Sequence, residues 1–377
     1  MLQKTTIFAT MKNPIKLQQI AAHFRLQGTV TDVSPLGNGL INDTFKVTTK
    51  GGETPDYVLQ RINHHVFQDV ELLQRNIEIV TRHIRQKLLA AGESDIERKV
   101  LQFLTADNGK TYYRDDEGSY WRMSVLIPRS FTYNEVTPPY SYEAGLAFGH
   151  FESMLTDVEE QLGETIPDFH NMELRLRQLS EAVAQDAAGR VKETGRELDL
   201  IREHANDMCR AEVLFREGKL PKRICHCDTK VNNMLFDEDG KVLCVIDLDT
   251  VMPSFIFSDY GDFLRTAANT VAEDSPALEQ IQFREDIFQS FTEGFLSGTK
   301  PFITPLEVEM LPYAVALFPM MQAVRFLTDY LNGDTYYKIA YPQHNLVRTR
   351  NQLQFFSRIA EQENNIRTFI DQKRLTL

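Results

Sequence analysis

The sequence predicts an α+β protein with a β-rich N-terminal lobe and a mainly helical C-terminal lobe. Up to Ile127, short runs rich in β-branched and aromatic residues surround one long helical stretch. From Tyr140 onward, amphipathic helical patterns dominate instead. A chain of 377 residues is also long for a single hydrophobic core, so its length favours two lobes.

The N-terminal lobe should contain five or six strands and a helix. The first three strands are expected at residues 30–33, 43–49 and 57–62. A long helix over residues 66–91 follows, because apolar side chains recur there at helical spacing and Gly92 can end it. The remaining strands are expected at residues 99–104, 110–113 and 120–127. Pro128 then marks a boundary between lobes 1–127 and 128–377.

The C-terminal lobe should be helical apart from one hairpin. Amphipathic patterns cover residues 141–156, 173–217, 258–272, 282–297, 305–332 and 344–374. Near the middle, two short apolar runs, 234–236 and 242–246, are separated by a turn that ends at Gly240. This arrangement predicts a β-hairpin.

The most informative residues flank that hairpin. The pattern His226-x-Asp228-x-x-x-x-Asn233 leads into its first strand, and Asp247 follows its second strand. Because a hairpin returns the chain to its starting end, Asn233 and Asp247 should lie close together. A kinase-type site needs one carboxylate to accept the proton of a hydroxyl, and an amide with a second carboxylate to hold Mg²⁺ on nucleotide phosphates. The sequence therefore predicts a bilobal protein-kinase-like fold and phosphoryl transfer.

The expected roles follow from this order of groups. Asp228 is the candidate catalytic base, and Lys230 can neutralise charge on the transferred phosphoryl group. Asn233 and Asp247 are the candidate Mg²⁺ ligands, since Mg²⁺ prefers oxygen donors and keeps positions open for phosphate. The alternative is that the aspartates are solvated turn residues and the asparagine a cap.

A second glycine-containing segment lies where a loop covering the nucleotide phosphates is expected. Gly37 and Gly39 stand between the first two predicted strands, although two glycines also suit a plain turn. On the third strand Gln60 takes the likeliest position of the kinase lysine, with Arg61 beside it on the opposite face. Which residue clamps the phosphates, and whether Glu71 or Glu78 pairs with it, stays open at this point. The residues expected to bind ATP are Gly37, Asn38, Gly39, Asn42, Thr44, Gln60 and Leu235.

Other polar clusters have two interpretations each. Asp259 is expected to cap a helix, and Asp262 and Arg265 to pair or to brace the catalytic loop. Arg325, Asp329 and the segment 332–337 form a polar group after an apolar helix. Structural ion pairing and binding of a polar ligand both explain that group.

Composition excludes several classes of protein. A net charge of −12 without a long basic run argues against nucleic-acid binding, and no apolar stretch is long enough to cross a membrane. The four cysteines do not form a disulfide framework in a chain of this size. Cys225-His226-Cys227 favours a buried reduced pair over a zinc site, because no further cluster completes a tetrahedron. A cytoplasmic protein, monomeric or weakly self-associating, is the default expectation.

These residues resemble the aminoglycoside phosphotransferase/choline kinase superfamily, and within it the N-acetylhexosamine 1-kinases. The resemblance extends from about residue 17 to about residue 360 and is strongest in segments 37–45, 57–63, 226–233, 246–253, 259–262 and 341–350. It implies ATP- and Mg²⁺-dependent phosphorylation of the anomeric hydroxyl of GlcNAc or GalNAc. Asp228 matches the base, and Asn233 and Asp247 match the metal ligands. Arg325 and Tyr336 match sugar-binding positions, and Gln60 also matches the subfamily.

Two other classes of function remain open. A kinase of the same superfamily acting on homoserine, choline or an aminoglycoside would keep the chemistry and change the acceptor. A catalytically inactive binding module would lose the chemistry, but the presence of Asp228, Asn233 and Asp247 disfavours it.

Overall fold

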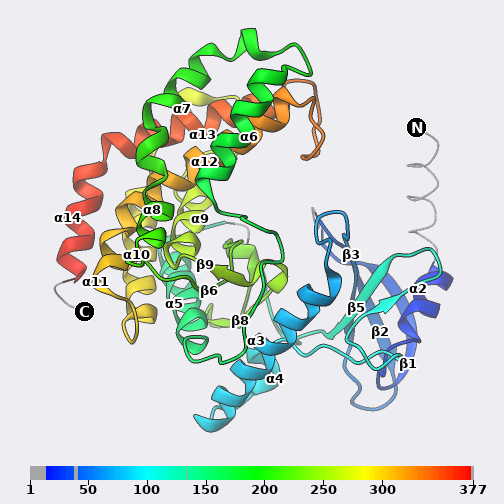
Figure 1. Ribbon diagram of the computed structural model, residues 1–377. Coiled ribbons are helices and arrows are strands. Elements are labelled where there is room, and N and C mark those ends of the chain that lie inside the picture. Colours follow the sequence, from blue (N-terminus) through cyan, green and yellow to red (C-terminus); the bar gives the residue numbers. More distant parts are fainter. Residues whose placement is uncertain (1–13, 38–40, 134, 375–377) are drawn as a thin grey trace. The chain divides into compact units, whose positions relative to one another are not determined.

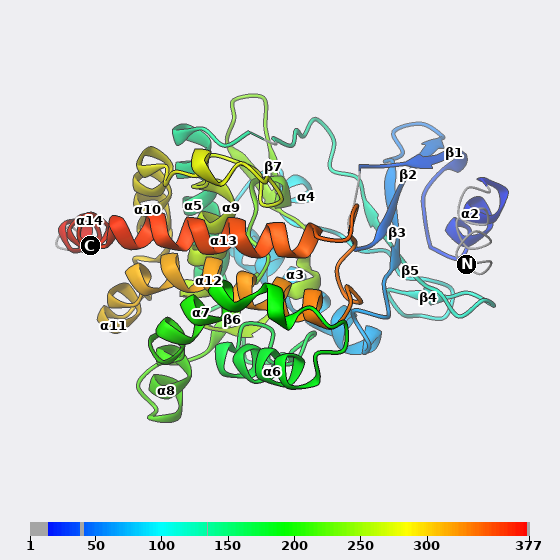
Figure 2. The ribbon, with the colours of Figure 1, turned by 90° about the horizontal axis from the view of Figure 1, so that it is seen from above.

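The structure, a computed structural model, describes residues 14–37, 41–133 and 135–374 (Figures 1 and 2). It confirms the α+β class, with a sheet in the N-terminal region and helices in the C-terminal region. The chain forms two compact units. The first runs to Ser130 and includes Val158–Ile166, and the second comprises Phe131–Asp157 and the chain from Pro167. No helix within the described ranges is long and apolar enough to cross a membrane.

The N-terminal unit is built on a five-stranded antiparallel sheet with the order β1-β2-β3-β5-β4. Its strands are β1 Thr29–Pro35, β2 Asp43–Lys50, β3 Tyr57–Ile62, β4 Tyr113–Arg114 and β5 Tyr120–Val125. Phe45, Leu59 and Met123 point to one face and are buried with Leu17 and Ile20 of helix α2 (Pro14–Ala21). The side chains at alternate positions point to the other face, where Arg122 of β5 contacts Gln74 of helix α3 (Val70–Ala90).

The strand expected at residues 99–104 does not form. Ile96–Lys99 is the short helix α4, and the extended segment after it joins β5 through an isolated bridge between Phe103 and Ser124. Strand β4 pairs with the other end of the same edge of β5. Because two segments share this edge, neither becomes a long strand. Val158–Ile166 returns to this unit through Asn76 of α3, whose Nδ2 donates to the carbonyl oxygen of Gly163 at 2.8 Å.

The C-terminal unit is a helical assembly around α12 (Leu311–Leu331), which is buried along most of its length. Figure 2 shows α13 (His344–Glu361) running alongside it, and α6 and α9 also pack on it. The other helices are α5 Pro138–Met154, α6 Met172–Gln185, α7 Gly195–Met208, α8 Arg210–Arg216, α9 Phe257–Ala267, α10 Glu285–Thr299, α11 Pro305–Glu309 and α14 Glu363–Arg374. The amphipathic pattern over residues 173–217 covers three helices. Asp186 and Gly189 adopt left-handed conformations after α6 and so end the first of them.

Helices α5 and α10 approach closely through glycines on both sides. A Cβ atom added at Gly294 of α10 would lie 2.1 Å from the carbonyl oxygen of Tyr142. A Cβ atom added at Gly145 of α5 would lie 2.3 Å from the carbonyl oxygen of Phe291. Both clashes are with backbone atoms, so a side chain here can be accommodated only if the helices separate.

We expect Gly294→Ala to lower the melting temperature, although alanine is the better helix former. Overpacking costs about 1–3 kcal/mol or more, which exceeds the ~1 kcal/mol gained from helix propensity. Thermal unfolding followed by circular dichroism measures the change. Gly195→Ala at the start of α7 is the control, since its Cβ would meet no atom within 4 Å. Equal melting temperatures for the two variants would contradict the close approach.

Candidate active site

The candidate catalytic loop lies between two short antiparallel pairs of strands in the C-terminal unit. Strand β6 (Arg223–Cys225) leads into the loop and pairs with β9 (Met252–Ser254). The loop then enters the expected hairpin of β7 (Met234–Phe236) and β8 (Val242–Val245). The backbone N–H of Ile246 donates to the carbonyl oxygen of Asn233 at 2.9 Å. Asn233 and Asp247 therefore lie at the same open end of the hairpin, as the spacing predicts.

Asp228, Lys230 and Asn233 contact one another directly. The Nζ of Lys230 lies 2.6 Å from the Oδ1 of Asp228, and both side chains remain about one-third exposed (36% and 29%). The Nδ2 of Asn233 donates to the carbonyl oxygen of Asp228 at 2.7 Å, which fixes the amide. Burial raises the pKa of Asp228, but the charge of Lys230 and its hydrogen bond outweigh this, so the pKa of Asp228 is lowered overall. Asp228 is therefore ionised at neutral pH, the state that a general base needs.

We expect Lys230→Met to move the acidic limb of the pH–rate profile to higher pH. The substitution removes the charge that lowers the pKa of Asp228 and leaves the burial that raises it. The base form of Asp228 exists only above its pKa, so activity should then disappear at a higher pH than in wild type. The pH dependence of kcat/KM measures this shift separately from any fall in kcat. An acidic limb that stays in place would contradict the coupling of Lys230 to Asp228.

Asp259 of α9 holds the backbone of the catalytic loop. Its carboxylate accepts the backbone N–H groups of His226 and Cys227, both at 2.7 Å. Cys227 has a positive φ of 64°, so these two bonds stabilise an unusual backbone conformation. The expectation that Asp259 caps a helix was wrong, because α9 begins at Phe257 and Asp259 lies inside its first turn. Its carboxylate instead satisfies N–H groups of the loop 32 and 33 residues earlier.

Asp262 and His226 complete the support of this loop. Asp262 accepts the backbone N–H of Thr229 at 3.1 Å and pairs with Arg265, so both expected roles of this residue are present. The Nε2 of His226 faces the carbonyl oxygen of Ile246 at 2.8 Å, which requires Nε2 to carry the proton. Its Nδ1 then accepts the backbone N–H of Asp228 at 3.3 Å. His226 thus links the catalytic loop to the residue before Asp247.

The buried carboxyl group of Glu152 lies close to Asp259. Glu152 of α5 is 2% exposed, and both of its carboxyl oxygens lack a hydrogen-bond donor among the residues that the structure describes. Ligand-type atoms of Glu152, Cys225 and Asp259 lie within 4.8 Å of one another. Burial and the charge of Asp259 raise the pKa of Glu152 well above its usual range. Glu152 is therefore neutral. Burial raises the pKa of Asp259 as well, and the N–H groups of His226 and Cys227 oppose that rise.

Asn233 and Asp247 provide a donor set that fits a divalent cation such as Mg²⁺. The Nδ2 of Asn233 faces Asp228, which leaves the amide oxygen as the group that can bind a metal. Asp247 has a left-handed conformation (φ 60°) two residues after the end of β8. Two oxygen donors at one end of a hairpin suit Mg²⁺, which keeps further positions for water and phosphate.

The structure describes some, but not all, of the residues of the N-terminal unit that are expected to bind ATP. Gly37 has a φ of 69°, whereas Asn38 and Gly39 lie outside the described residues. The Oδ1 of Asn42 accepts the backbone N–H of Asn63 at 2.9 Å, which ties the end of the loop to the end of β3. Thr44 lies opposite Gln60 in the sheet. In the C-terminal unit, Leu235 is half-buried on β7.

The residues around the third strand differ from the expected lysine–glutamate pair. The Nε of Arg122 donates to the Oε1 of Gln60 at 2.9 Å, while Arg61 pairs with Asp43. The two candidate helix carboxylates are directed elsewhere: Glu71 pairs with Lys110, and Glu78 accepts the hydroxyl of Thr111. The helix residue that meets the strand network is Gln74, which accepts from Nη1 of Arg122 at 3.4 Å.

Arg325 of α12 lies in an aromatic cluster. Its guanidinium carbon is 5.0 Å from the ring centre of Phe169 and 5.8 Å from that of Tyr337. Tyr337 packs edge-on against Tyr336, which is 57% exposed. The structure therefore brings Arg325 and Tyr336 into one neighbourhood. The expected pairing of Arg325 with Asp329 is replaced by a hydrogen bond of 3.0 Å to Gln322.

Asp329 has a structural role in this cluster. It accepts the backbone N–H groups of Thr335, Tyr336 and Tyr337, and the Nδ2 of Asn345. These bonds hold the segment after α12 in a fixed conformation. Asp329 thus positions Tyr336 and Tyr337.

Arg175 and His170 join this group. Burial, together with the charge of Arg325, lowers the pKa of Arg175 to about 10, so the guanidinium group of Arg175 is still charged at neutral pH. Burial and the charges of Arg325 and Arg175 lower the pKa of His170 well below its usual range, so His170 is neutral. The charge of Asp228 acts on His170 in the opposite sense and raises its pKa, but by less than burial and the arginines lower it. Its Nδ1 has no hydrogen-bond partner among the described residues.

Comparison with known proteins identifies the family. A model of the phosphotransferase enzyme family matches residues 32–295, which is most of the chain. The chain belongs to this family. Among solved structures, the phosphotransferase resembles an amicoumacin kinase in complex with AMP-PNP, Ca²⁺ and Ami, with 13% identity, 94% of this chain and 97% of that chain covered, and a TM-score of 0.61.

Two further solved structures share the fold of this phosphotransferase. One is an aminoglycoside phosphotransferase from Alicyclobacillus acidocaldarius, with 14% identity, 96% of each chain covered and a TM-score of 0.57. The other is a microcompartment-associated aminopropanol kinase, with 15% identity, 93% of this chain and 98% of that chain covered, and a TM-score of 0.55. At such identities the likeness concerns the fold alone. It confirms the kinase-like fold of the phosphotransferase.

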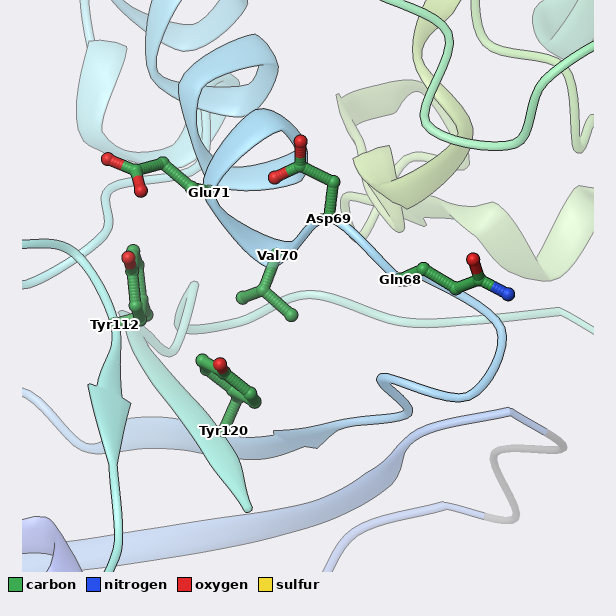
Figure 3. A pocket seen from close by; sticks show the side chains of 6 residues that line it. All are labelled: Gln68, Asp69, Val70, Glu71, Tyr112 and Tyr120. Atoms are coloured by element: carbon green, nitrogen blue, oxygen red, sulfur yellow. The ribbon is translucent and has the colours of Figure 1, made fainter. Parts of the chain in front are cut away.

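A pocket of the phosphotransferase is lined by none of the residues expected to bind ATP. It is a hollow of about 390 Å³ in the N-terminal unit, lined by Gln68, Asp69, Val70, Glu71, Tyr112 and Tyr120 (Figure 3). Asp69 caps α3 by accepting the backbone N–H of Leu72, and Glu71 pairs with Lys110. Two carboxylates in the lining do not suit a phosphate group, so we assign the hollow no part in binding the nucleotide.

Sequence reasoning missed Arg122, His170 and Arg175. His170 precedes the cap of α6, and a histidine and an arginine flanking a helix start are unremarkable in a pattern search. Arg122 lies in the middle of a strand, where a charged residue between Trp121 and Met123 was the available signal. A buried charge in a central strand requires partners, and that requirement could have directed attention to Gln60.

Proposed function

We propose that this phosphotransferase transfers the terminal phosphoryl group of ATP to the anomeric hydroxyl of an N-acetylhexosamine. The arrangement of Asp228, Asn233 and Asp247 around the hairpin supports phosphoryl transfer. Asp228 accepts the proton of the acceptor hydroxyl as its oxygen attacks phosphorus, and ADP leaves. Lys230 stabilises negative charge that spreads over the transferred group.

We assign the binding of ATP, the phosphoryl donor, to residues of both units. Gly37 and its neighbours offer backbone N–H groups to the phosphates, and Gln60 offers an amide. Asn42 and Thr44 shape the loop and strand that carry these donors. Leu235 supplies an apolar contact for the base. Asn233 and Asp247 would hold Mg²⁺, which would neutralise charge on the phosphates.

The acceptor is assigned to the cluster around Arg325. Two charged guanidinium groups act on each other there, and the aromatic rings of Phe169 and Tyr337 lie against Arg325. Such a surface repels cationic acceptors such as aminoglycosides and choline. It suits a neutral sugar, whose hydroxyl and acetamido oxygens accept hydrogen bonds from guanidinium and phenol groups. Tyr336 and Arg325 are the proposed sugar contacts.

We expect Arg325→Ala to raise KM for the sugar by about tenfold or more and to leave KM for ATP nearly unchanged. The loss corresponds to one charged hydrogen bond, about 1.5–3 kcal/mol. Steady-state kinetics with each substrate varied in turn measure both constants. Arg348→Gln is the control for loss of charge. In wild type the guanidinium of Arg348 lies over the ring of Phe326 on the neighbouring helix. A parallel rise in both KM values would contradict an acceptor-specific role for Arg325.

An ADP-release assay against free sugars, amino alcohols, homoserine, choline and aminoglycosides tests the acceptor. We expect GlcNAc or GalNAc to give the highest kcat/KM. Phosphorus NMR then distinguishes a sugar 1-phosphate from a 6-phosphate, because only the 6-phosphate retains a reducing end. Higher kcat/KM with an aminoglycoside or an amino alcohol would overturn the acceptor and leave the phosphotransferase assignment intact.

A further inference from the structure

We propose that Arg122 supplies the positive charge that protein kinases place on the third strand as a lysine, and that it acts on the donor phosphates through the amide of Gln60. Gln60 is the contact with the nucleotide, and Arg122 is a positioning residue. The inference rests on the proposed function, because its ligand is the phosphate chain of ATP.

The register of the sheet aligns the residues concerned. Thr44 of β2 lies opposite Gln60 of β3, and Gln60 lies opposite Arg122 of β5. Residues directly opposite one another in neighbouring strands point to the same face. This face is the one turned away from α2, since Phe45 and Leu59 point to the α2 side. The row begins beside the glycine loop, because the backbone N–H of Leu36 donates to the carbonyl oxygen of Thr44 at 2.9 Å.

Hydrogen bonds fix the orientation of the Gln60 amide. Its oxygen accepts from the Nε of Arg122 at 2.9 Å, and its nitrogen donates to the hydroxyl of Thr44 at 3.2 Å. An amide nitrogen carries two N–H donors, and the bond to Thr44 uses one of them. None of the described residues accepts the second donor. The amide therefore offers an N–H group to an anion.

Gln60 and Arg122 differ in exposure to solvent, and their proposed roles differ accordingly. Gln60 is half-buried and can touch a ligand, whereas Arg122 is 2% exposed. The guanidinium polarises the amide through a charge-assisted bond and adds a positive potential at short range, where burial reduces screening by water. On its other side, Arg122 donates to the amide oxygen of Gln74. The strand–helix pair of kinases is thus replaced by the series Gln60–Arg122–Gln74.

Removal of the charge should weaken the donor and not the acceptor. We expect Arg122→Gln to raise KM for ATP roughly ten- to hundredfold, the range for loss of a charged hydrogen bond, and to change KM for the acceptor less than threefold. The double variant Gln60→Lys/Arg122→Gln returns a cation to β3 and should recover most of the loss. A merely structural arginine would not be rescued in this way. Arg114→Gln on the exposed edge strand β4 is the matched control and should behave as wild type.

Because Arg122 is buried, its replacement can cost stability, so Gln60→Leu is measured in parallel. This variant retains Arg122, removes the proposed contact and should raise KM for ATP to a similar extent. Binding of Mg·ATP without acceptor, followed by calorimetry, separates the two proposals. If wild type does not bind ATP, both the proposed donor and this inference are wrong. If wild type binds ATP and Gln60→Leu binds it equally well, or if the double variant is no better than Arg122→Gln, only this inference is wrong.

Discussion

Asp228→Asn should lower kcat by roughly 10²–10⁴-fold and leave folding and ATP binding nearly unchanged. The amide keeps the shape of the side chain and can still orient a hydroxyl group, but it cannot take a proton. The backbone bonds of Asp228, from its N–H to His226 and from the side chain of Asn233 to its carbonyl oxygen, do not depend on the carboxylate. The loop should therefore retain its conformation.

Single-turnover kinetics at saturating ATP and acceptor measure the chemical step of this variant directly. Melting temperature and ATP affinity, measured on the same preparation, show whether the loop has kept its structure. Asp199→Asn on the exposed face of α7 is the control, since it removes one carboxylate charge far along the chain from the loop. Turnover of Asp228→Asn within threefold of wild type would exclude Asp228 as the base.

The hairpin that carries Asn233 and Asp247 could be predicted because its contacts are local. Asn233 and Asp247 are brought together by one turn ending at Gly240, and the strands on the two sides of that turn pair with each other. Apolar runs and turn residues encode such a unit within a short window. The same holds for β2 and β3, whose pairing sets Thr44 beside Gln60.

The side chains that hold the candidate site in place could not be predicted, because they come from distant parts of the chain. Asp259 lies more than 30 residues from the N–H groups that it accepts, and Arg122 lies 62 residues from Gln60. An aspartate in the first turn of a helix is equally compatible with a cap and with a distant N–H partner, so the pattern alone favoured the commoner role. Likewise, Asp329 could be an ion pair or a backbone acceptor. The choice is made by Thr335, Tyr336 and Tyr337, whose backbone N–H groups it accepts.

The helix boundaries near the C-terminus could not be predicted either. The amphipathic pattern over residues 344–374 continues through Gln362, yet the structure divides it into α13 and α14 there. Hydrophobic periodicity reports which face is buried and is insensitive to a short break that preserves that face. Both helices bury apolar side chains against the same core, so the pattern continues across the break.

Asp247→Asn should reduce activity by about a hundredfold or more and shift the Mg²⁺ concentration for half-maximal rate upward. Asparagine retains an oxygen and tolerates the left-handed backbone that Asp247 adopts, so the backbone should survive. What is lost is a full negative charge on a hard oxygen ligand, and divalent cations bind carboxylates more strongly than amides. Initial rates titrated with Mg²⁺ at fixed ATP give the midpoint.

Asn233→Ala should move the same midpoint in the same direction by a smaller amount, because an uncharged ligand is removed. Asp239→Ala is the matched control, since this exposed carboxylate lies in the turn at the opposite end of the same hairpin. High Mg²⁺ should partly restore the rate of Asp247→Asn, whereas no Mg²⁺ concentration should restore Asp228→Asn, whose defect is in proton transfer. An unchanged Mg²⁺ midpoint in both hairpin variants would place the metal elsewhere and leave Asn233 and Asp247 as structural residues.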